Sequence, residues 1–251
     1  MHRRQRHLSP VNAGAQVSLD ARFIAGQADN TTLQTWSSRP GASIEASQST
    51  AGSRPTYRSS SMNGQPAIVF DGVDDCYDLS SAALSLTKDA TGIVAMCVHQ
   101  CVAVTDAVGY TLFMSSGGSA GSSRFSIRPV DTSTMRVVGS FRRTDGDGNV
   151  ITAQAGSPAN PSIARITADY AGGFGRCAVN AGTERSVAFS SGAGPGPTND
   201  SLVARIGGAS TAAQRSNLKV GIMVIMTPAP SASLLKRIRH HMAYSYKITS
   251  Q

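Results

Sequence analysis

The stretch RPTYRSSSMNGQPAIVFDGVDDCYDLSS, residues 54–81, contains the pattern from which the fold can be argued. Its Asn-Gly pair is a polar turn dipeptide. The apolar run Ala-Ile-Val-Phe that follows predicts a short buried strand. Asp71-Gly72 then predicts the turn that ends this strand, because Asp bonds its own backbone and Gly accepts a positive φ angle. A strand placed between two turns indicates a β-protein whose chain reverses often.

Further aspartates follow this turn, so the same stretch holds a cluster of carboxylates, Asp71, Asp74, Asp75 and Asp78. Clustered carboxylates can bind calcium together with backbone carbonyls, and Asp71, Asp74 and Asp75 are the candidate ligands. The alternative, which we favour, is that the aspartates only form the turn and the rim of a loop. Apart from calcium, no cofactor is expected.

The composition agrees with one turn-rich β-domain. The chain has 251 residues with 25 glycines and 11 prolines, and only 15% of its residues are charged. Segments with strand character recur between turn clusters, and several alternate between apolar and polar residues. They are residues 16–24, 65–72, 92–104, 110–116, 124–130, 134–144, 149–155, 161–170, 175–182, 185–191, 201–208 and 219–226. We predict an arm at residues 1–14 and the domain at residues 15–251.

One segment, residues 231–246, has helical character. It follows two prolines, and Ser231 or Ser233 can cap its first turn. Its apolar side chains fall on one stripe, with the basic residues away from it. The stripe consists of Leu234, Leu235, Ile238, Met242 and Ser245. A single amphipathic helix at the end of a β chain predicts a helix that packs across the sandwich.

Two other segments imitate metal sites. Residues 145–149 begin like a calcium loop, but the Glu expected at its twelfth position is Gly156, so we predict a hairpin turn. Cys97 and Cys101 would be about 13 Å apart in an extended strand, which is too far for one zinc ion. We therefore predict buried free thiols at all four cysteines, Cys76, Cys97, Cys101 and Cys177.

The sequence lacks a recognisable catalytic set. A glycosidase usually needs two carboxyl groups flanking the scissile bond. The only glutamates are Glu45 and Glu184, both in turn-like surroundings, and no strand carries alternating acids. A G-x-S-x-G elbow and a phosphate-binding glycine loop are absent as well. We therefore expect that the chain is not an enzyme.

The formal net charge of +8 favours an acidic partner. The basic residues gather in the N-terminal MHRRQRH and in KRIRHH, residues 236–241. We do not expect nucleic acid as the partner, because a basic stripe interleaved with aromatic residues is missing. Instead, Arg3, Arg4 and Arg6 of the arm are predicted to attach the domain to an acidic protein surface. Neither a secretory signal nor a membrane span is expected.

Two segments near the N-terminus resemble the opening of LamG-like, concanavalin A-type jelly-roll domains: QVSLDARF and LQTWSSRPGASIEASQSTAGSRPTYRSSSMNGQPAIVFDGVDDCYDLSS. The matching residues are Leu19, Asp20, Ala21, Trp36, Arg54, Pro55, Asn63, Gly64, Phe70, Asp71 and Gly72. The C-terminal segment, ARIGGASTAAQRSNLKVGIMVIMTPAPSASLLKRIRHHMAYSYKI, is similar to the closing pattern of this family. The resemblance implies an all-β, concanavalin A-like jelly-roll sandwich of two antiparallel sheets.

The resemblance implies several possible functions, because this superfamily contains lectins, glucanases, adhesion modules and virus structural proteins. In phages, chains of this kind resemble capsid decoration proteins, head fibres and tail-associated adhesins. Our first expectation is therefore a structural virion protein, made in the host cytoplasm, that attaches to capsid or tail proteins and forms homo-oligomers.

The alternative is a carbohydrate-binding, lectin-like module for host surface glycans. Such sites stack sugars on exposed aromatic side chains. Trp36 is the first candidate, although we favour a core position for it, and Tyr57, Tyr77 and Tyr110 are the weaker candidates. A glycoside hydrolase is a remote third option, because the Glu-x-Asp-x-Glu strand of the family's glucanase branch is absent.

Overall fold

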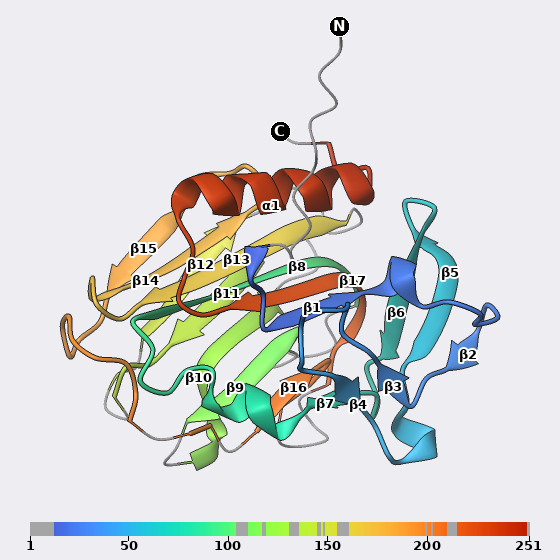
Figure 1. Ribbon diagram of the computed structural model, residues 1–251, viewed down its shortest axis with the longest axis horizontal. Helices are drawn as coiled ribbons and strands as arrows, with labels where there is room; N and C mark the ends of the chain where they lie inside the picture. Colours follow the sequence, from blue (N-terminus) through green and yellow to red (C-terminus); the bar gives the residue numbers. More distant parts are fainter. Residues whose placement is uncertain are drawn as a thin grey trace, which may run out of the picture.

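The structure, a computed structural model, is a sandwich of two antiparallel β-sheets with one α-helix on its outside (Figure 1). It describes residues 13–103, 110–116, 119–130, 136–144, 147, 149–154, 161–198, 200–201, 203–209 and 215–249. The predicted all-β sandwich with a C-terminal helix is confirmed. The basic arm, with Arg3, Arg4 and Arg6, lies outside the described residues and stays a prediction.

The larger sheet, sheet A, has the strand order β15-β14-β13-β8-β17-β6-β5-β2, and β1 also pairs with β17. Its strands are β1 (Val17–Asp20), β2 (Thr31–Thr32), β5 (Thr56–Met62), β6 (Gln65–Asp71), β8 (Gly92–Ala103), β13 (Ser162–Asp169), β14 (Phe174–Val179), β15 (Arg185–Ala188) and β17 (Asn217–Met226). Strands far apart in the sequence, such as β8 and β17, are therefore neighbours at the centre of the sheet.

The smaller sheet, sheet B, has the order β12-β11-β10-β9-β16-β7-β4-β3. Its strands are β3 (Thr35–Trp36), β4 (Ala46–Ser47), β7 (Tyr77–Leu79), β9 (Leu112–Ser116), β10 (Ser119–Val130), β11 (Arg136–Phe141), β12 (Asn149–Gln154) and β16 (Ala204–Ile206). Short 3₁₀ turns are η2 (Ala21–Phe23), η3 (Ala51–Ser53) and η4 (Ser81–Ser85).

The stretch at residues 54–81 folds as its turns predict. Asn63 and Gly64 have φ angles of 52° and 74°, and they join β5 to β6 in a hairpin. Phe70 of β6 is fully buried, and Gly72 takes the predicted positive φ, 82°. The chain then turns into β7, which belongs to the other sheet. This stretch therefore connects the two layers of the sandwich.

Each of the strand segments predicted from the sequence contains an observed strand, whereas five others were not predicted. The missed strands are β2, β3, β4, β5 and β7. Four of them have only two or three residues, which is too short for an alternating pattern. The fifth, β5, reads TYRSSSM, and its polar composition does not distinguish a strand from a loop.

The core between the sheets is built around aromatic side chains. Trp36 and Tyr77 have ring centroids 6.4 Å apart, and Tyr77 meets Phe70 edge-on at 6.0 Å. Phe125 and Phe141 form a second pair, at 6.2 Å. The four cysteines are buried thiols, as predicted.

The helix α1 (Ala232–Ser245) lies over the outer face of sheet A (Figure 1). The side chain of Ser231 caps it by accepting a hydrogen bond from the Leu234 N–H. Its buried residues are Leu235, Ile238, Met242 and Ser245, all of them on the predicted stripe. They pack on the outward side chains of β8 and β17, Val94, Met96, Val98, Ile222, Val224 and Met226. Among the described residues, no helix is long and apolar enough to cross a membrane.

The carboxylate of Asp147 joins the β11–β12 hairpin to the loop at Ser190 and Ser191. It is 1% exposed and accepts hydrogen bonds from the N–H groups of Arg143, Thr144 and Ser191 and from both serine hydroxyls. Burial raises the pKa of Asp147, but these hydrogen bonds outweigh burial and hold the pKa well below its usual range. The pairing of β11 with β12 confirms the predicted hairpin, although residues 145, 146 and 148 of its turn lie outside the described ones.

Replacing Ile238 of α1 by Ala tests whether the helix is part of the folded core. We expect Ile238→Ala to lower the free energy of unfolding by about 2–5 kcal/mol, because it leaves a cavity under the helix. Arg237→Ala, at an exposed position of the same helix, should change it by less than about 0.5 kcal/mol. Equal small effects in urea unfolding would mean that α1 is not packed as described.

Candidate functional site

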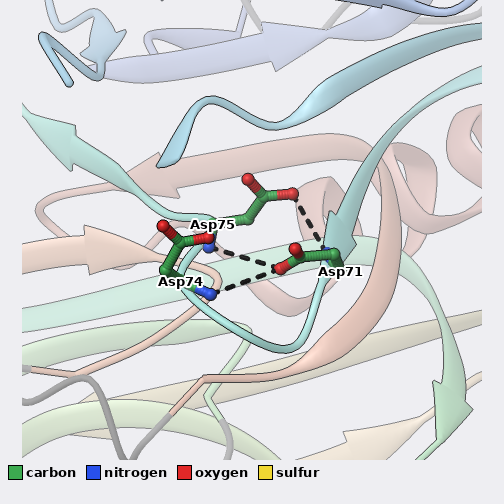
Figure 2. A group of neighbouring side chains, drawn as sticks. All are labelled: Asp71, Asp74 and Asp75. Atoms are coloured by element: carbon green, nitrogen blue, oxygen red, sulfur yellow. Dashed lines mark hydrogen bonds between the residues drawn. The ribbon is translucent and has the colours of Figure 1, made fainter. Parts of the chain in front are cut away.

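The predicted carboxylate cluster is present at the end of β6 (Figure 2). Carboxylate oxygens of Asp71, Asp74 and Asp75 lie within 4.8 Å of one another. Asp71 Oδ1 accepts hydrogen bonds from the N–H groups of Val73 (2.8 Å), Asp74 (3.4 Å) and Asp75 (3.4 Å). The predicted Asp-Gly turn is thus formed. Asp78 is not part of this cluster, since it pairs with Arg205 at 2.6 Å.

Asp75 is the buried member of the cluster, with 6% of its surface exposed. Its Oδ2 accepts a hydrogen bond from the Asp71 N–H at 3.0 Å. Burial, together with the negative charges of Asp71 and Asp74, raises the pKa of Asp75 to about 6. The hydrogen bonds account for the cluster as a turn, and calcium binding by Asp71, Asp74 and Asp75 stays a prediction.

The three aromatic residues predicted to stack sugars do not form a binding site. Trp36 and Tyr77 are fully buried, and Tyr57 is only 6% exposed. The Tyr77 hydroxyl is also engaged, because it donates to the Leu33 carbonyl at 2.9 Å. Tyr110 is buried too, at 7% exposure. A sugar needs an exposed ring face, so sugar stacking on these rings is wrong, whereas the core position that we favour for Trp36 is confirmed.

The outer face of sheet A carries a polar strip that α1 leaves uncovered. Because side chains of a strand alternate between faces, Arg165, Thr167 and Asp169 of β13 point to one side. Arg176 of β14 lies opposite Thr167, and Phe174, which is 41% exposed, lies opposite Asp169. The strip therefore combines charged groups, a hydroxyl and an exposed aromatic ring.

A groove of about 490 Å³ lies between this strip and the start of α1, and we call it the sheet groove. Strands β13 and β14 and the connection from β14 to β15 contribute Arg165, Thr167, Asp169, Arg176 and Glu184 to its lining. On the opposite side, Ala229 and Pro230 precede the helix, and Ala232 and Leu235 belong to α1. One wall is thus polar and the other apolar. Pockets of this size, about 300–1,000 Å³, commonly bind small molecules.

Ion pairs hold the polar side chains of the sheet groove in place. Arg176 bridges two acids, with its guanidinium 3.4 Å from Asp169 and 3.9 Å from Glu184. Arg165 also pairs with Glu184. Each arginine of the groove therefore has a carboxylate partner, and the network offers donors and acceptors side by side.

None of the sheet-groove residues is a candidate in the sequence analysis, where Glu184 is set aside as turn-like. The sequence does contain one sign of the polar strip. Arg165, Thr167 and Asp169 place polar groups at alternate positions of an otherwise apolar strand, which indicates a polar face. The sequence does not show which strands lie beside β13, so it could not place Arg176 and Glu184 next to them.

Comparisons with known proteins inform on the fold. No protein-family model and no curated protein matches this sequence. Among solved structures, Trypanosoma rangeli sialidase in complex with sialic acid is similar with a TM-score of 0.61 and 12% identity, over 90% of this chain and 33% of the sialidase. The Ruminococcus gnavus IT-sialidase CBM40 bound to α2,3-sialyllactose has a TM-score of 0.52 and 14% identity, over 67% of this chain and 93% of the CBM40. A leech intramolecular trans-sialidase has a TM-score of 0.51 and 13% identity, over 74% of this chain and 27% of that enzyme.

This chain thus spans about a third of the length of the Trypanosoma rangeli sialidase. At these identities, the likeness establishes the β-sandwich fold alone. The β-sandwich predicted from the sequence is confirmed as a fold. A LamG or phage relationship has no support among these structures.

The comparison contradicts the prediction that the chain is not an enzyme, because the structures with this fold include sialidases. The physical reason is that not every glycosidase uses a pair of flanking carboxylates. The exclusion rested on a missing pair of flanking carboxylates, whereas sialidases use a tyrosine nucleophile and do not follow that scheme. The missing carboxylate pair therefore does not exclude glycoside hydrolysis.

Replacing Asp75 by Asn tests the buried carboxylate. Because the folded-state pKa of about 6 lies above the ordinary value of about 4, the native state binds the proton more tightly than the unfolded state does. The free energy of unfolding contributed by Asp75 must then fall as pH rises from about 4 to about 6. Asp75→Asn should remove this fall, as measured by urea unfolding at a series of pH values.

Burial lowers the pKa of His99 to about 4, which has the opposite effect on stability in the same pH range. His99 is present in both proteins, so its effect cancels when the variant is compared with the wild type. A stability difference that stays constant across this pH range would contradict the raised pKa of Asp75.

Proposed function

We propose that this chain is a carbohydrate-binding domain and that the sheet groove is its glycan site. The observation that carries the proposal is the ion-paired polar strip on β13 and β14, facing the apolar wall of α1 across an open groove. The fold likeness to the Ruminococcus gnavus CBM40, which covers 93% of that chain, supports a domain of this class.

The chemistry of the sheet groove suits a sugar. Sugar hydroxyl groups both donate and accept hydrogen bonds, and here guanidinium donors of Arg165 and Arg176 stand beside carboxylate acceptors of Asp169 and Glu184. The ion pairs orient these groups before a ligand arrives, which lowers the entropy lost on binding. Phe174, at the edge of the strip, offers an exposed ring to the apolar face of a sugar.

The virion role predicted from the sequence is compatible with this proposal, since a protein on a virion surface can also bind host glycans. Its attachment residues, Arg3, Arg4 and Arg6, lie outside the described residues. Deleting residues 1–14 and measuring attachment to the particle of origin tests that role, with the fold checked by circular dichroism. Attachment that survives the deletion would contradict it.

Binding to a panel of neutral and sialylated oligosaccharides, measured by calorimetry, tests the glycan site. Sialylated ligands are included because they are bound in the similar structures. We expect Arg176→Gln to weaken binding at least about tenfold, because Arg176 holds both Asp169 and Glu184. Arg58→Gln is the matched control, since Arg58 is also an ion-paired surface arginine but lies on β5, near the opposite edge of sheet A.

Two results would contradict the glycan site: no binding to any oligosaccharide, or equal binding by the Arg176 and Arg58 variants. The same incubations should be analysed for cleaved glycan by mass spectrometry, because about a third of a sialidase chain is similar to this domain. Cleavage that is lost in Arg176→Gln would make the sheet groove the site of a reaction as well as of binding.

A further inference from the structure

A second depression lies farther along α1, and we call it the distal hollow. Its volume is about 250 Å³. Ile163, Ala243 and Ile248 give it an apolar floor, and Asn180, Arg239 and Tyr244 are among its polar and aromatic lining. Tyr244 is 73% exposed, the largest exposed fraction among the exposed large hydrophobic side chains of the described residues.

The sheet groove and the distal hollow follow one another along the same side of the helix. Ala232 and Leu235 line the groove, and Arg239 and Ala243 line the hollow. These positions are spaced by three or four residues, so they share one face of α1. The same holds for the sheet, because Ile163 in the hollow and Arg165 in the groove are alternate residues of β13 and point to one side.

The charges of the two depressions differ. Both arginines of the sheet groove, Arg165 and Arg176, are paired with carboxylates. Arg239 instead donates to the Asn180 carbonyl at 3.1 Å and lies 3.3 Å from His240 Nε2. Among the described residues, no carboxylate lies within ion-pair distance of Arg239. Within the described part of the chain, the positive charge of Arg239 is thus not balanced by a neighbouring carboxylate.

The surroundings of Arg239 favour an anionic ligand. Burial lowers the pKa of Arg239, and the neighbouring positive charge of Arg165 lowers it further. An anion bound in the hollow would raise the pKa of Arg239, because a negative charge stabilises the protonated guanidinium. A planar guanidinium binds a carboxylate with two parallel hydrogen bonds, which makes it more selective than a point charge.

We propose that the sheet groove and the distal hollow form one elongated glycan site, in which the hollow binds a carboxylate-bearing terminal sugar. Arg239 pairs with the carboxylate, the ring packs against Tyr244 and the apolar floor, and the sheet groove holds the neutral units. The ligand class is therefore an oligosaccharide that ends in an acidic sugar, either a sialic acid or a hexuronic acid. This inference rests on the proposed carbohydrate-binding function.

Calorimetry on the full chain with three related ligands tests the inference: lactose, 3′-sialyllactose, and lactose extended by glucuronic acid. We expect at least one acidic ligand to bind about 10- to 100-fold more tightly than lactose. Its advantage should shrink as sodium chloride screens the charge. The acidic ligand that binds more tightly identifies which acidic sugar the hollow accepts.

Three variants of the hollow and one control variant assign the preference to the hollow. Arg239→Gln should reduce acidic-ligand binding to the level of lactose, and Arg239→Lys should restore part of the preference. Tyr244→Ala should weaken the acidic ligand. Arg237→Gln, which removes an exposed positive charge on the same helix but outside the lining of the hollow, should change neither ligand.

The outcomes separate this inference from the proposed function. If lactose and the acidic ligands bind equally, or if Arg237→Gln reduces the preference as much as Arg239→Gln does, the distal hollow is not an acid-selective part of the site. The proposed function then still stands, provided that Arg176→Gln weakens lactose binding. Absence of binding to every ligand overturns both.

Discussion

The arrangement of this domain depends on one constraint: the central strands β8 and β17 are apolar on both faces. Their inward side chains, such as Cys97 and Met223, fill the core between the sheets. Their outward side chains, such as Met96 and Val224, would meet water if nothing covered them. Helix α1 provides the cover, and its buried stripe matches the outward row. The position of the helix thus follows from the burial of the central strands.

Covering the centre of sheet A also creates the candidate site. Beyond the helix, the outward residues of β13 and β14 change from apolar to polar, and Arg165, Asp169 and Arg176 remain partly exposed. The apolar side of α1 then faces a row of charged side chains across the sheet groove. A sugar ring has an apolar face and a polar edge. The groove offers an apolar wall to the face and a polar wall to the edge. The same packing that stabilises the fold therefore shapes the place where we expect the glycan.

The carboxylates of the domain differ in the partners that the folded chain places beside them. Asp71 and Asp147 accept hydrogen bonds from nearby backbone N–H groups, so each holds a loop together. Asp169 and Glu184 instead line the sheet groove and pair with the arginines Arg165 and Arg176. All four are acidic residues near turns in the sequence, and only their partners in the folded chain distinguish them. The sequence alone therefore does not distinguish the acidic residues of the groove from those of the turns.

The sequence by itself determined the fold class, the longer strands, the Asn63-Gly64 and Asp71-Gly72 turns, and the apolar stripe of α1. These features arise from local periodicity and backbone preference, which a short window of residues contains. Only the tertiary structure decided that Tyr57 and Tyr77 are buried and that Tyr244 is exposed, because burial depends on what packs against a residue from elsewhere in the chain. It also decided that Arg176 lies opposite Thr167 and that Arg239 reaches Asn180. Strand order and register set such neighbours across long sequence separations, and no local pattern encodes them.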